Sequence, residues 1–443
     1  MDNRVRKTMA RITPTVFCVL LSISFPFSLF PNSPLPRVDS AVVSTTTLEG
    51  RLAVFDDAWA RINERYYDHG FHGLDWDAQR VAFRAEAAKA ESAQELYAVL
   101  RRMIASLNDP HTRVFAPEEK FDWWRPRFIT VGFVLAEIAG LPTVVKVDRE
   151  SAAERAGVRA GDVIETVNRA PAISLVKSRL VNLKDPTNAS ARFRVFAKLL
   201  DGPVDTSIEI AWRGKEGRQR SARFVRYWQQ RELGLRVSRE RGDYAVVDLE
   251  AFTKPIATAF ARSLREKLKG ARGVILDLRT NGGGDAEAMS DIASAFLGTG
   301  VDLGKFTDRV GTSFTIFTQA TSLLVINPFE QTKVPLIVLT SERTASAAEI
   351  FIEALRVSRR ATIIGAQTCG CVLAVRTRHL LPDGGLLDVS ELNYQTAQGR
   401  RLEGHGLEPD EKVMVERPDL YAGRDRAMIA AFHQLASVTK QSH

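Results

Sequence analysis

The sequence predicts an α/β protein with a largely parallel sheet, joined to a smaller β-rich domain and an N-terminal helical segment. Three observations predict it. Strand-like and helix-like segments alternate from residue 243 onward, short β runs occupy residues 126–226, and apolar residues recur at helical spacing before residue 108. Because 443 residues are too many for one ordinary core, we expect two or three domains.

Residues 48–107 are predicted to be helical, since apolar side chains recur three and four residues apart. Ser92-Ala-Gln-Glu95 has the pattern of a capping box at the start of the last helix. Asn108-Asp109-Pro110 is expected to end that helix.

The middle of the chain is predicted to form one small β-rich domain that ends near residue 226. Its expected strands are separated by short loops that are rich in small residues. They are Phe128–Leu135, Thr143–Val147, Val163–Val167 and Ser207–Trp212.

The last half of the chain is predicted to hold the parallel sheet. The expected strands are Tyr244–Leu249, Val274–Leu278, Val334–Thr340 and Ala361–Ile364, and the expected helices are Lys254–Leu268 and Ser346–Val357. Functional sites in such sheets lie beyond the carboxyl ends of the strands. Two segments meet that condition, residues 279–285 and 341–347.

The N-terminus has the order of an export signal. Four basic residues, between Arg4 and Arg11, precede an apolar stretch, Ile12–Phe30, that approaches the length needed to span a bilayer. We expect residues 1–41 to be a signal peptide or an N-terminal membrane anchor through residues 12–30. The protein would then be exported to the periplasm or another extracytoplasmic space. A buried N-terminal helix is the alternative.

The net charge of +8 points to no particular partner, because the leader holds a good part of it and no basic run alternates with aromatic residues. We therefore expect no nucleic-acid partner. Beyond the leader the chain has two cysteines, Cys369 and Cys371. We expect no disulfide framework, because a ring closed across one residue would be strained, and two ligands make no zinc site. No metal or cofactor is predicted.

A candidate nucleophile lies in Thr344-Ala-Ser-Ala-Ala-Glu349, which follows an apolar strand and opens a helix. The unpaired N–H groups and positive potential of a helix N-terminus suit a nucleophilic serine and the oxyanion that it generates. The alternative is that Ser346 or Thr344 only caps the helix. Glu349 is most simply a favourable charge near the helix N-terminus.

A glycine turn, Asn281-Gly-Gly-Gly284, follows another strand. Glycines let backbone N–H groups approach a ligand closely, so the turn could form part of an oxyanion hole. It matches neither the Walker pattern nor a dinucleotide fingerprint. A tight turn without function is the alternative, and Asp277 and Arg279 are expected to brace it.

Taken together, the motifs resemble the C-terminal-processing (tail-specific) serine peptidase family. The resemblance covers about residues 50 to 415, including a middle domain similar to a PDZ module over Ser151–Asn168. The segments that carry it are Asp277-Leu-Arg-Thr-Asn-Gly-Gly-Gly284, Thr344-Ala-Ser-Ala-Ala-Glu349, Gly365-Ala-Gln-Thr-Cys-Gly370 and Glu403-Gly-His-Gly-Leu-Glu-Pro-Asp410, together with Gly73-Leu-Asp-Trp76 and Leu107-Asn-Asp-Pro-His-Thr112 near the start.

The resemblance implies a ClpP/crotonase-like α/β protease core with Ser346 as nucleophile. Ala347 and Gly283 would donate the oxyanion-hole N–H groups. A PDZ module implies capture of a free protein C-terminus by strand addition, with Val131, Gly132 and Phe133 as the carboxylate-binding loop.

The expected domain boundaries follow from the same resemblance. They are 42–115 for the helical domain, 116–230 for the PDZ-like domain, 231–420 for the peptidase core and 421–443 for a C-terminal tail helix.

The general base departs from the family pattern. Many members use a lysine 25 positions after the serine and a glutamine four positions further, where this chain has Cys371 and Val375. A thiol could accept a proton only as a thiolate, so we do not expect Cys371 to act as the base.

A histidine-using branch of the family, which includes tricorn-like enzymes, takes its base from an Asp-x-His-Thr/Ser segment. Asp109-Pro-His-Thr112 is similar to it, and the pKa of histidine suits general-base work at neutral pH. The resemblance implies a triad of Ser346, His111 and Glu403. A turn histidine capped by Asp109 is the alternative for His111, and His405 is a rival base.

We therefore expect an exported serine endopeptidase that recognises protein C-termini through its PDZ domain and hydrolyses peptide bonds through an acyl-enzyme. Its expected partners are proteins or peptides with free C-termini. The alternative is a catalytically inactive relative, which has lost the lysine and acts only as a C-terminal peptide-binding module.

Overall fold

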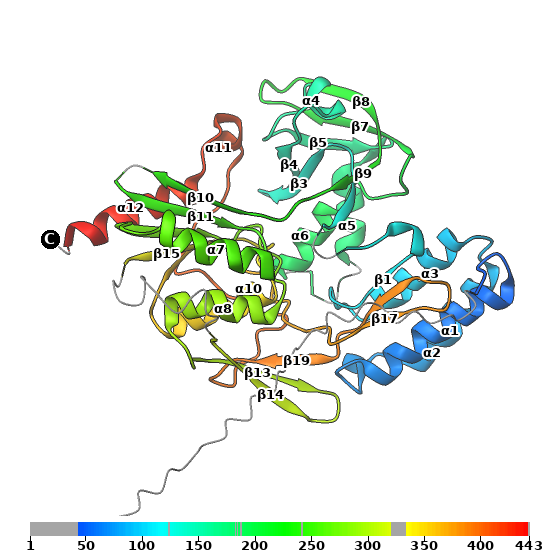
Figure 1. The fold of residues 1–443 in the computed structure, drawn as a ribbon. Helices are drawn as coiled ribbons and strands as arrows, with labels where there is room; N and C mark the ends of the chain where they lie inside the picture. Colours follow the sequence, from blue (N-terminus) through cyan, green and yellow to red (C-terminus); the bar gives the residue numbers. More distant parts are fainter. Residues whose placement is uncertain are drawn as a thin grey trace, which may run out of the picture.

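One six-stranded sheet is built from the last half of the chain (Figure 1). The structure, a computed structural model, describes residues 43–122, 125–181, 183, 185, 186, 188–240, 242–319 and 334–441. The predicted leader lies outside these residues. In sheet order, the strands are β10 (Leu235–Glu240), β11 (Tyr244–Leu249), β12 (Gly273–Asp277), β15 (Leu336–Thr340), β16 (Thr362–Gly365) and β20 (Glu411–Lys412).

The sheet is largely parallel, as predicted. β10 pairs with β11 in the antiparallel sense, and every other neighbouring pair is parallel. The predicted strand Tyr244–Leu249 coincides with β11. The carboxyl ends of β12 and β15 therefore meet at one edge, where the glycine turn and the Ser346 segment follow them.

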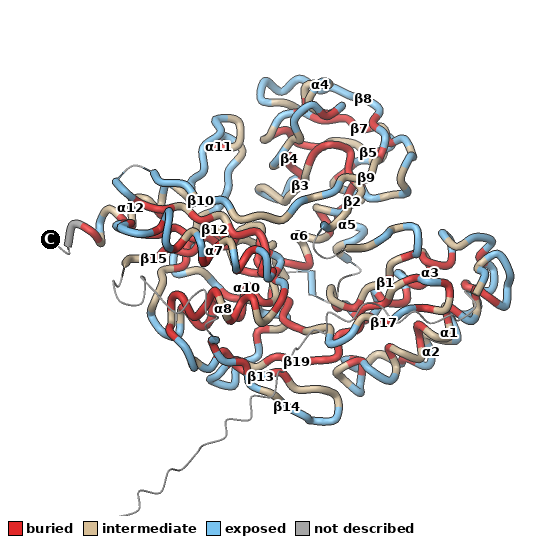
Figure 2. Tube along the Cα trace, in the orientation of Figure 1, coloured by how far each residue is buried: buried red, intermediate tan, exposed pale blue. Residues whose placement is uncertain are grey.

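Helices cover both faces of this sheet. On one face lie α7 (Lys254–Glu266), α8 (Ala286–Leu297) and α10 (Ala347–Val357), and on the other lies α12 (Arg426–Gln441). Successive strand side chains point to opposite faces, so Leu276 and Val338 join the first core while Ile337 and Leu339 join the second. Figure 2 shows the resulting buried strands and inner helix faces.

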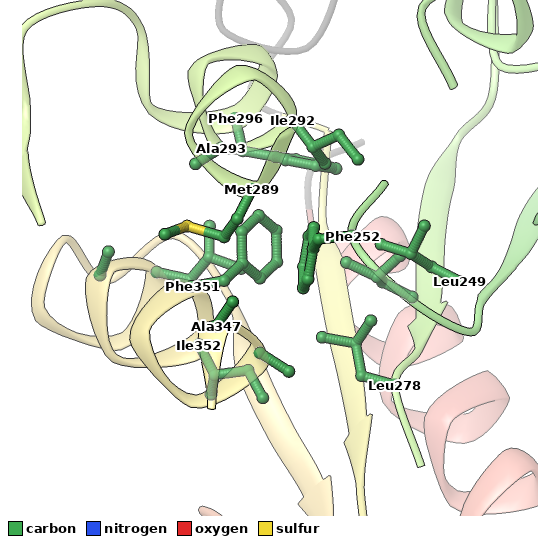
Figure 3. Packing of buried hydrophobic residues seen from close by; sticks show 14 of the residues in the cluster. Leu249, Phe252, Leu278, Met289, Ile292, Ala293, Phe296, Ala347, Phe351 and Ile352 are labelled. Carbon is green, nitrogen blue, oxygen red and sulfur yellow. The ribbon is translucent and has the colours of Figure 1, made fainter. Parts of the chain in front are cut away.

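Aromatic packing anchors α10, the helix that begins beside Ser346. The ring of Phe351 lies 5.4 Å from that of Phe252 and 5.9 Å from that of Phe296 on α8. Met289 and Ala347 close the same cluster (Figure 3). Because Phe351 is fully buried, this cluster fixes the helix against the sheet.

The N-terminal region is helical, with α1 (Leu48–Arg65), α2 (Trp76–Lys89) and α3 (Ala93–Ala105) packed around one core. Ser92 caps α3, because its hydroxyl accepts from the Glu95 N–H. The second half of the predicted capping box is wrong, because the Glu95 carboxylate accepts from the Glu91 N–H instead of the Ser92 N–H. Short 3-10 helices occupy Phe71–Gly73 and Pro117–Glu119.

The N-terminal region is joined to the later chain by a small sheet. Its strand β1 (Arg113–Phe115) pairs with β18 (Leu386–Asp388), which pairs with β17 (Arg378–Leu380). A second small sheet, in the order β14 (Ser313–Phe317), β13 (Asp302–Asp308) and β19 (Leu392–Gln395), lies near α8 and α10.

The middle domain is a separate β-rich unit with its own core. A ladder of β2 (Arg127–Thr130) and β9 (Tyr227–Gln230) lies at its entry and exit. Its sheet has the order β3 (Phe133–Ile138), β4 (Leu141–Val147), β5 (Val163–Val167), β7 (Ser207–Arg213) and β8 (Gln219–Val225), with β6 (Ala170–Pro171) paired to β5. Its helices are α4 (Ala152–Arg155), α5 (Ala172–Val181) and α6 (Ala189–Ala197).

One strand prediction in this domain is wrong. Phe128–Leu135 was expected to be continuous, but it is divided into β2 and β3 at Val131 and Gly132. Gly132 has φ +95°, and a side chain there would meet that of Ser151 at 2.7 Å. The chain therefore turns at a position that only glycine fits.

The C-terminal segment touches both the sheet and the middle domain. Between β20 and α12 lies α11 (Arg417–Ala422), whose Tyr421 hydroxyl donates to Asp162 at 3.1 Å. None of the helices in the described part of the chain is both long and apolar enough to cross a bilayer.

Candidate active site

Ser346 lies directly after the β15 loop, at the position that precedes α10. Its backbone has φ 57° and ψ −125°, a strained conformation for a residue with a side chain. The Ser346 N–H donates to the carbonyl of Cys371 at 2.8 Å and to Glu349 Oε2 at 3.1 Å. The side chain makes no capping hydrogen bond, so the helix-cap alternative does not account for this serine.

Thr344, the other candidate cap, has a different task. Its hydroxyl donates to the carbonyl of Leu278 at 2.8 Å and accepts from the Ser341 N–H at 3.0 Å. It thus ties the loop after β15 to the end of β12. This contact fixes the nucleophile segment beside the glycine turn.

Glu349 has a larger role than its sequence position indicates. Its fully buried carboxylate accepts four hydrogen bonds, and burial raises its pKa. The donors are Ser346 N (3.1 Å), Thr368 Oγ1 (2.5 Å), Gly370 N (2.7 Å) and Cys371 N (2.9 Å). It joins the nucleophile to residues 368–371. Three donors are backbone groups, which no sequence pattern reveals.

The glycine turn lies against Ser346, as the oxyanion-hole prediction requires. Gly283 has φ +98°, and a Cβ on it would lie 2.7 Å from Ser346 Cβ and 3.0 Å from Ala347 N. The Gly283 N–H, however, donates to Asn281 Oδ1 at 2.8 Å in this state. Ala347 is the first residue of α10, where an N–H has no acceptor within the helix.

An apolar pocket of about 60 Å³ opens beside Ser346. Side chains of several core elements line it, among them Met289, Phe306, Ile350 and Leu392. Its lining is mostly apolar.

His111 lies in a turn capped by Asp109, as its alternative interpretation predicted. Asp109 accepts from the His111 N–H at 2.8 Å and from the Thr112 hydroxyl at 2.6 Å. The His111 Nδ1 is buried without a hydrogen-bond partner, 3.9 Å from Asp109 Oδ1. Burial lowers the pKa of His111 to about 4, and Asp109 opposes that shift. The ring is therefore neutral at neutral pH, and in this state it is a weaker base than a free histidine.

Glu403 lies beside the loop that carries Cys371. Its Oε2 accepts from the N–H groups of Val372 at 2.7 Å and Leu373 at 3.1 Å. Burial raises its pKa to about 8, and the nearby Asp109 carboxylate adds to that shift. None of the hydrogen bonds of the described residues joins His111 to Ser346 or Glu403. The structure brings the three regions together but does not close the triad.

Arg194, on α6 of the middle domain, was missed by the sequence reasoning. It donates to the Ser190 hydroxyl at 2.8 Å, and its guanidinium lies 3.8 Å from Cys371 Sγ. Burial lowers its pKa, while Glu403 and Asp109 oppose that shift. No sequence signal could have found its contact with Cys371, because the two residues are 177 positions apart in the chain.

The expectation that the two cysteines are unbonded is wrong. Cys369 and Cys371 form a disulfide across Gly370. The loop folds back on itself here, with Gly370 at φ +68°. The separation of the two cysteines by one residue predicted no bond between them, because the sequence alone does not reveal this turn.

Arg279, Asp277 and His405, which the sequence also singled out, are held by ion pairs or backbone hydrogen bonds. Arg279 pairs with Asp277 at 2.6 Å and with Asp425 at 2.7 Å, and thus braces the turn. His405 is held through its backbone, which donates to the Leu402 carbonyl.

In the predicted carboxylate-binding loop, Val131 and Phe133 are buried. The Gly132 N–H donates to Thr130 Oγ1 at 3.0 Å. Among the described residues, no group of three or more His, Cys, Asp or Glu side chains is arranged to hold a metal ion.

Two family models match the chain. Residues 243–413, which hold Ser346 and the glycine turn, match Peptidase family S41, and residues 49–105 match the Tricorn protease C1 domain. The chain carries a peptidase family S41 domain and is a serine peptidase.

Named relatives of this S41 peptidase are carboxyl-terminal-processing enzymes. It is 29% identical over 380 residues to the carboxyl-terminal-processing protease of Synechocystis sp.. The matched region covers 82% of this chain and 80% of the relative. It is 27% identical over 399 residues to the chloroplastic C-terminal processing peptidase of Tetradesmus obliquus, which covers 85% and 80%.

Solved structures share the fold. A photosystem II D1 C-terminal processing protease superposes with a TM-score of 0.52 and 24% identity, and covers 83% of this chain and 93% of its own. Mature CPAF superposes with a TM-score of 0.66 and 14% identity, and covers 89% and 97%. The mixed α/β peptidase fold predicted from the sequence is confirmed.

Proposed function

We propose that this S41 peptidase is an exported endopeptidase that captures protein C-termini with a PDZ domain and cleaves nearby through an acyl-enzyme on Ser346. The observation that carries the proposal is the geometry of Ser346. A strained backbone, an uncapped hydroxyl and an apolar pocket meet at the N-terminus of α10.

In the proposed reaction, Ser346 Oγ attacks the substrate carbonyl while His111 takes its proton. His111 returns the proton to the leaving amine, and water then hydrolyses the acyl-enzyme in the same way. The Ala347 N–H stabilises the oxyanion, and the Gly283 N–H joins it after exchange of its Asn281 partner.

The proposal requires His111 to reach Ser346 when substrate is bound. Catalytic hydrogen bonds are often long in substrate-free enzymes and shorten in the complex. Glu403 would orient the imidazolium as it forms, in the role that the histidine-using branch of the family implies. The placement of Asp109 near both groups supports this arrangement.

Peptide capture by the middle domain is supported by its open strand. β3 lies at the edge of its sheet, and α6 packs alongside it. An extended C-terminus could add to this edge, with its carboxylate at Val131, Gly132 and Phe133. The relatives' names, which refer to carboxyl-terminal processing, support a substrate of this kind.

The middle domain also contacts the catalytic loops. Asn188, which caps α6, donates to the Gly404 carbonyl at 2.9 Å. A peptide bound along α6 would therefore lie near Ser346. Export is supported by the basic and then apolar leader, residues 1–41, and an anchor through residues 12–30 is part of the proposal.

The test is labelling by a serine-directed phosphonate, together with cleavage of a peptide that has a free C-terminus. Wild type is expected to label and cleave, S346A to do neither, and a C-terminally amidated peptide to be cut more slowly. Absent labelling of wild type, with peptide still bound, would favour the inactive binding module. Equal cleavage of free and amidated peptides would contradict C-terminal capture.

A further inference from the structure

The Cys369–Cys371 disulfide lies where three parts of the site meet. One side of its loop contacts the nucleophile segment, since Cys369 N donates to the Thr344 carbonyl at 2.9 Å and the Cys371 carbonyl accepts from Ser346 N at 2.8 Å. The loop between the two cysteines is held by Glu349, through Gly370 N and Cys371 N.

The other side of the loop contacts the proposed acid. The Gly370 carbonyl accepts from Gly404 N at 2.8 Å, and Val372, the residue after Cys371, donates its N–H to Glu403 at 2.7 Å. The conformation of one short loop thus sets the positions of both Ser346 and Glu403.

The third part is the middle domain. The Ser190 hydroxyl lies 3.0 Å from Cys369 Sγ and 3.8 Å from Cys371 Sγ, and the Arg194 guanidinium lies 3.8 Å from Cys371 Sγ. Both sulfur atoms therefore contact polar groups of α6. Cys371 is buried, whereas Cys369 is partly exposed and accessible to a small thiol.

We infer that the Cys369–Cys371 disulfide is a reducible positioning element, which holds Ser346 and Glu403 in the active arrangement and releases them when it is cleaved. The inference rests on the proposed function, because it takes Ser346 as the nucleophile and Glu403 as the acid.

The reduction balances with a dithiol as reductant. One thiolate of the dithiol attacks Cys369 Sγ, the S–S bond breaks, and Cys371 leaves as a thiolate that then takes a proton. The second thiol of the reductant displaces Cys369, which yields two protein thiols and a cyclic disulfide, with two electrons transferred. The nearby Arg194 guanidinium stabilises the leaving Cys371 thiolate. A small disulfide oxidant reverses the reaction.

Reduction is expected to change the positions of Ser346 and Glu403 more than it changes the fold. Two thiols cannot approach as closely as two bonded sulfurs, so the loop must widen between Cys369 and Cys371. A displacement of about 1 Å at catalytic groups can cost ~10²-fold in rate. The pocket is lined largely by residues of other elements, such as Met289 and Phe306, so substrate binding should change less.

The experiment compares the oxidised and dithiol-reduced full chain with a peptide substrate. We expect reduction to lower kcat by about 10–100-fold, with a smaller change in KM, and reoxidation to restore it. C369S/C371S should have the lower kcat, and the dithiol should not change it. C18S should respond to the dithiol as wild type does. Alkylation without reductant should leave Cys369 and Cys371 unmodified.

Several results would overturn the inference. They are alkylation of both cysteines in the oxidised chain, an unchanged kcat after verified reduction, or a dithiol effect that persists in C369S/C371S. If Ser346-dependent cleavage is present but insensitive to reduction, this inference fails and the proposed function stands. If neither redox form shows Ser346-dependent cleavage, the proposed function fails, and this inference with it.

Discussion

Ser346 donates its backbone N–H to the carbonyl oxygen of Cys371, 2.8 Å away. Cys371, where the family resemblance led us to expect a lysine, therefore holds the proposed nucleophile through the main chain. Its sulfur is bonded to Cys369 and faces α6. A bonded sulfur is not a thiolate, so Cys371 cannot take a proton in this state, and the proposed reaction assigns that step to His111.

We expect H111A to lower kcat/KM by about 10²–10⁴-fold, because the variant removes the proposed general base. H405A is the matched control, since the rival base is also a turn histidine, and it should change kcat/KM only slightly. Steady-state kinetics with a peptide substrate measures both. The reverse order of the two effects would exclude His111 as the base.

Replacement of Gly283 by alanine should abolish most of the activity. A Cβ at this position meets Ser346 Cβ at 2.7 Å, and the backbone has φ +98°. G282A is the matched control, because a Cβ on Gly282 has no neighbour within 4 Å. Phosphonate labelling should be lost in G283A and largely kept in G282A. Equal labelling of both variants would show that the turn does not form the oxyanion site.

E349Q should destabilise the site through unmatched hydrogen bonds. The carboxylate accepts four donors, whereas a glutamine places an NH₂ group among them. We expect a loss of about 1–3 kcal/mol in the free energy of unfolding and a lower kcat. Urea unfolding and phosphonate labelling check the two effects. An unchanged labelling rate would show that Glu349 does not position Ser346.

Stability should depend on the ionisation of Glu403. Burial raises its folded pKa from 4.5 to about 8, so it contributes stability that is fully present below pH 4.5 and is lost as the pH rises through about 8. Wild type should therefore lose free energy of unfolding as the pH rises from about 4.5 to about 8, which are the unfolded and folded pKa values. E403Q, which cannot ionise, should lose less. Parallel pH profiles of the two proteins would contradict the raised pKa.

The aromatic cluster under α10 should control the stability of the core. Phe351 is fully buried between Phe252 and Phe296, so F351A leaves a cavity. We expect a loss of about 3–5 kcal/mol in the free energy of unfolding. V357A, at a half-exposed position of the same helix, should cost much less. Similar unfolding midpoints for the two variants would contradict this role of the cluster.

The sheet and its edge were predictable because they depend on local patterns. β11 was predicted to the residue from its apolar run, and the site segments from their places after strands. The apolar run Phe128–Leu135 did not predict the turn at Gly132, although the family resemblance implied a loop at Val131, Gly132 and Phe133.

The partners around the nucleophile were harder to predict. Glu349 binds backbone amides and Arg194 approaches from another domain, so neither contact has a sequence pattern. The prediction for Cys369 and Cys371 was wrong for a different reason. The small ring was expected to be strained, but the backbone turn at Gly370 brings the two sulfurs together.

The pairing of β1 with β18 has a consequence for when the enzyme becomes active. It fastens the segment that bears His111 to strands that follow Ser346 in the chain, and Glu403 comes later still. A ribosome releases these segments in order, and domains fold as they emerge. A nascent chain would thus hold its histidine long before its serine and its glutamate. The proposed triad can therefore come together only after most of the chain has been made.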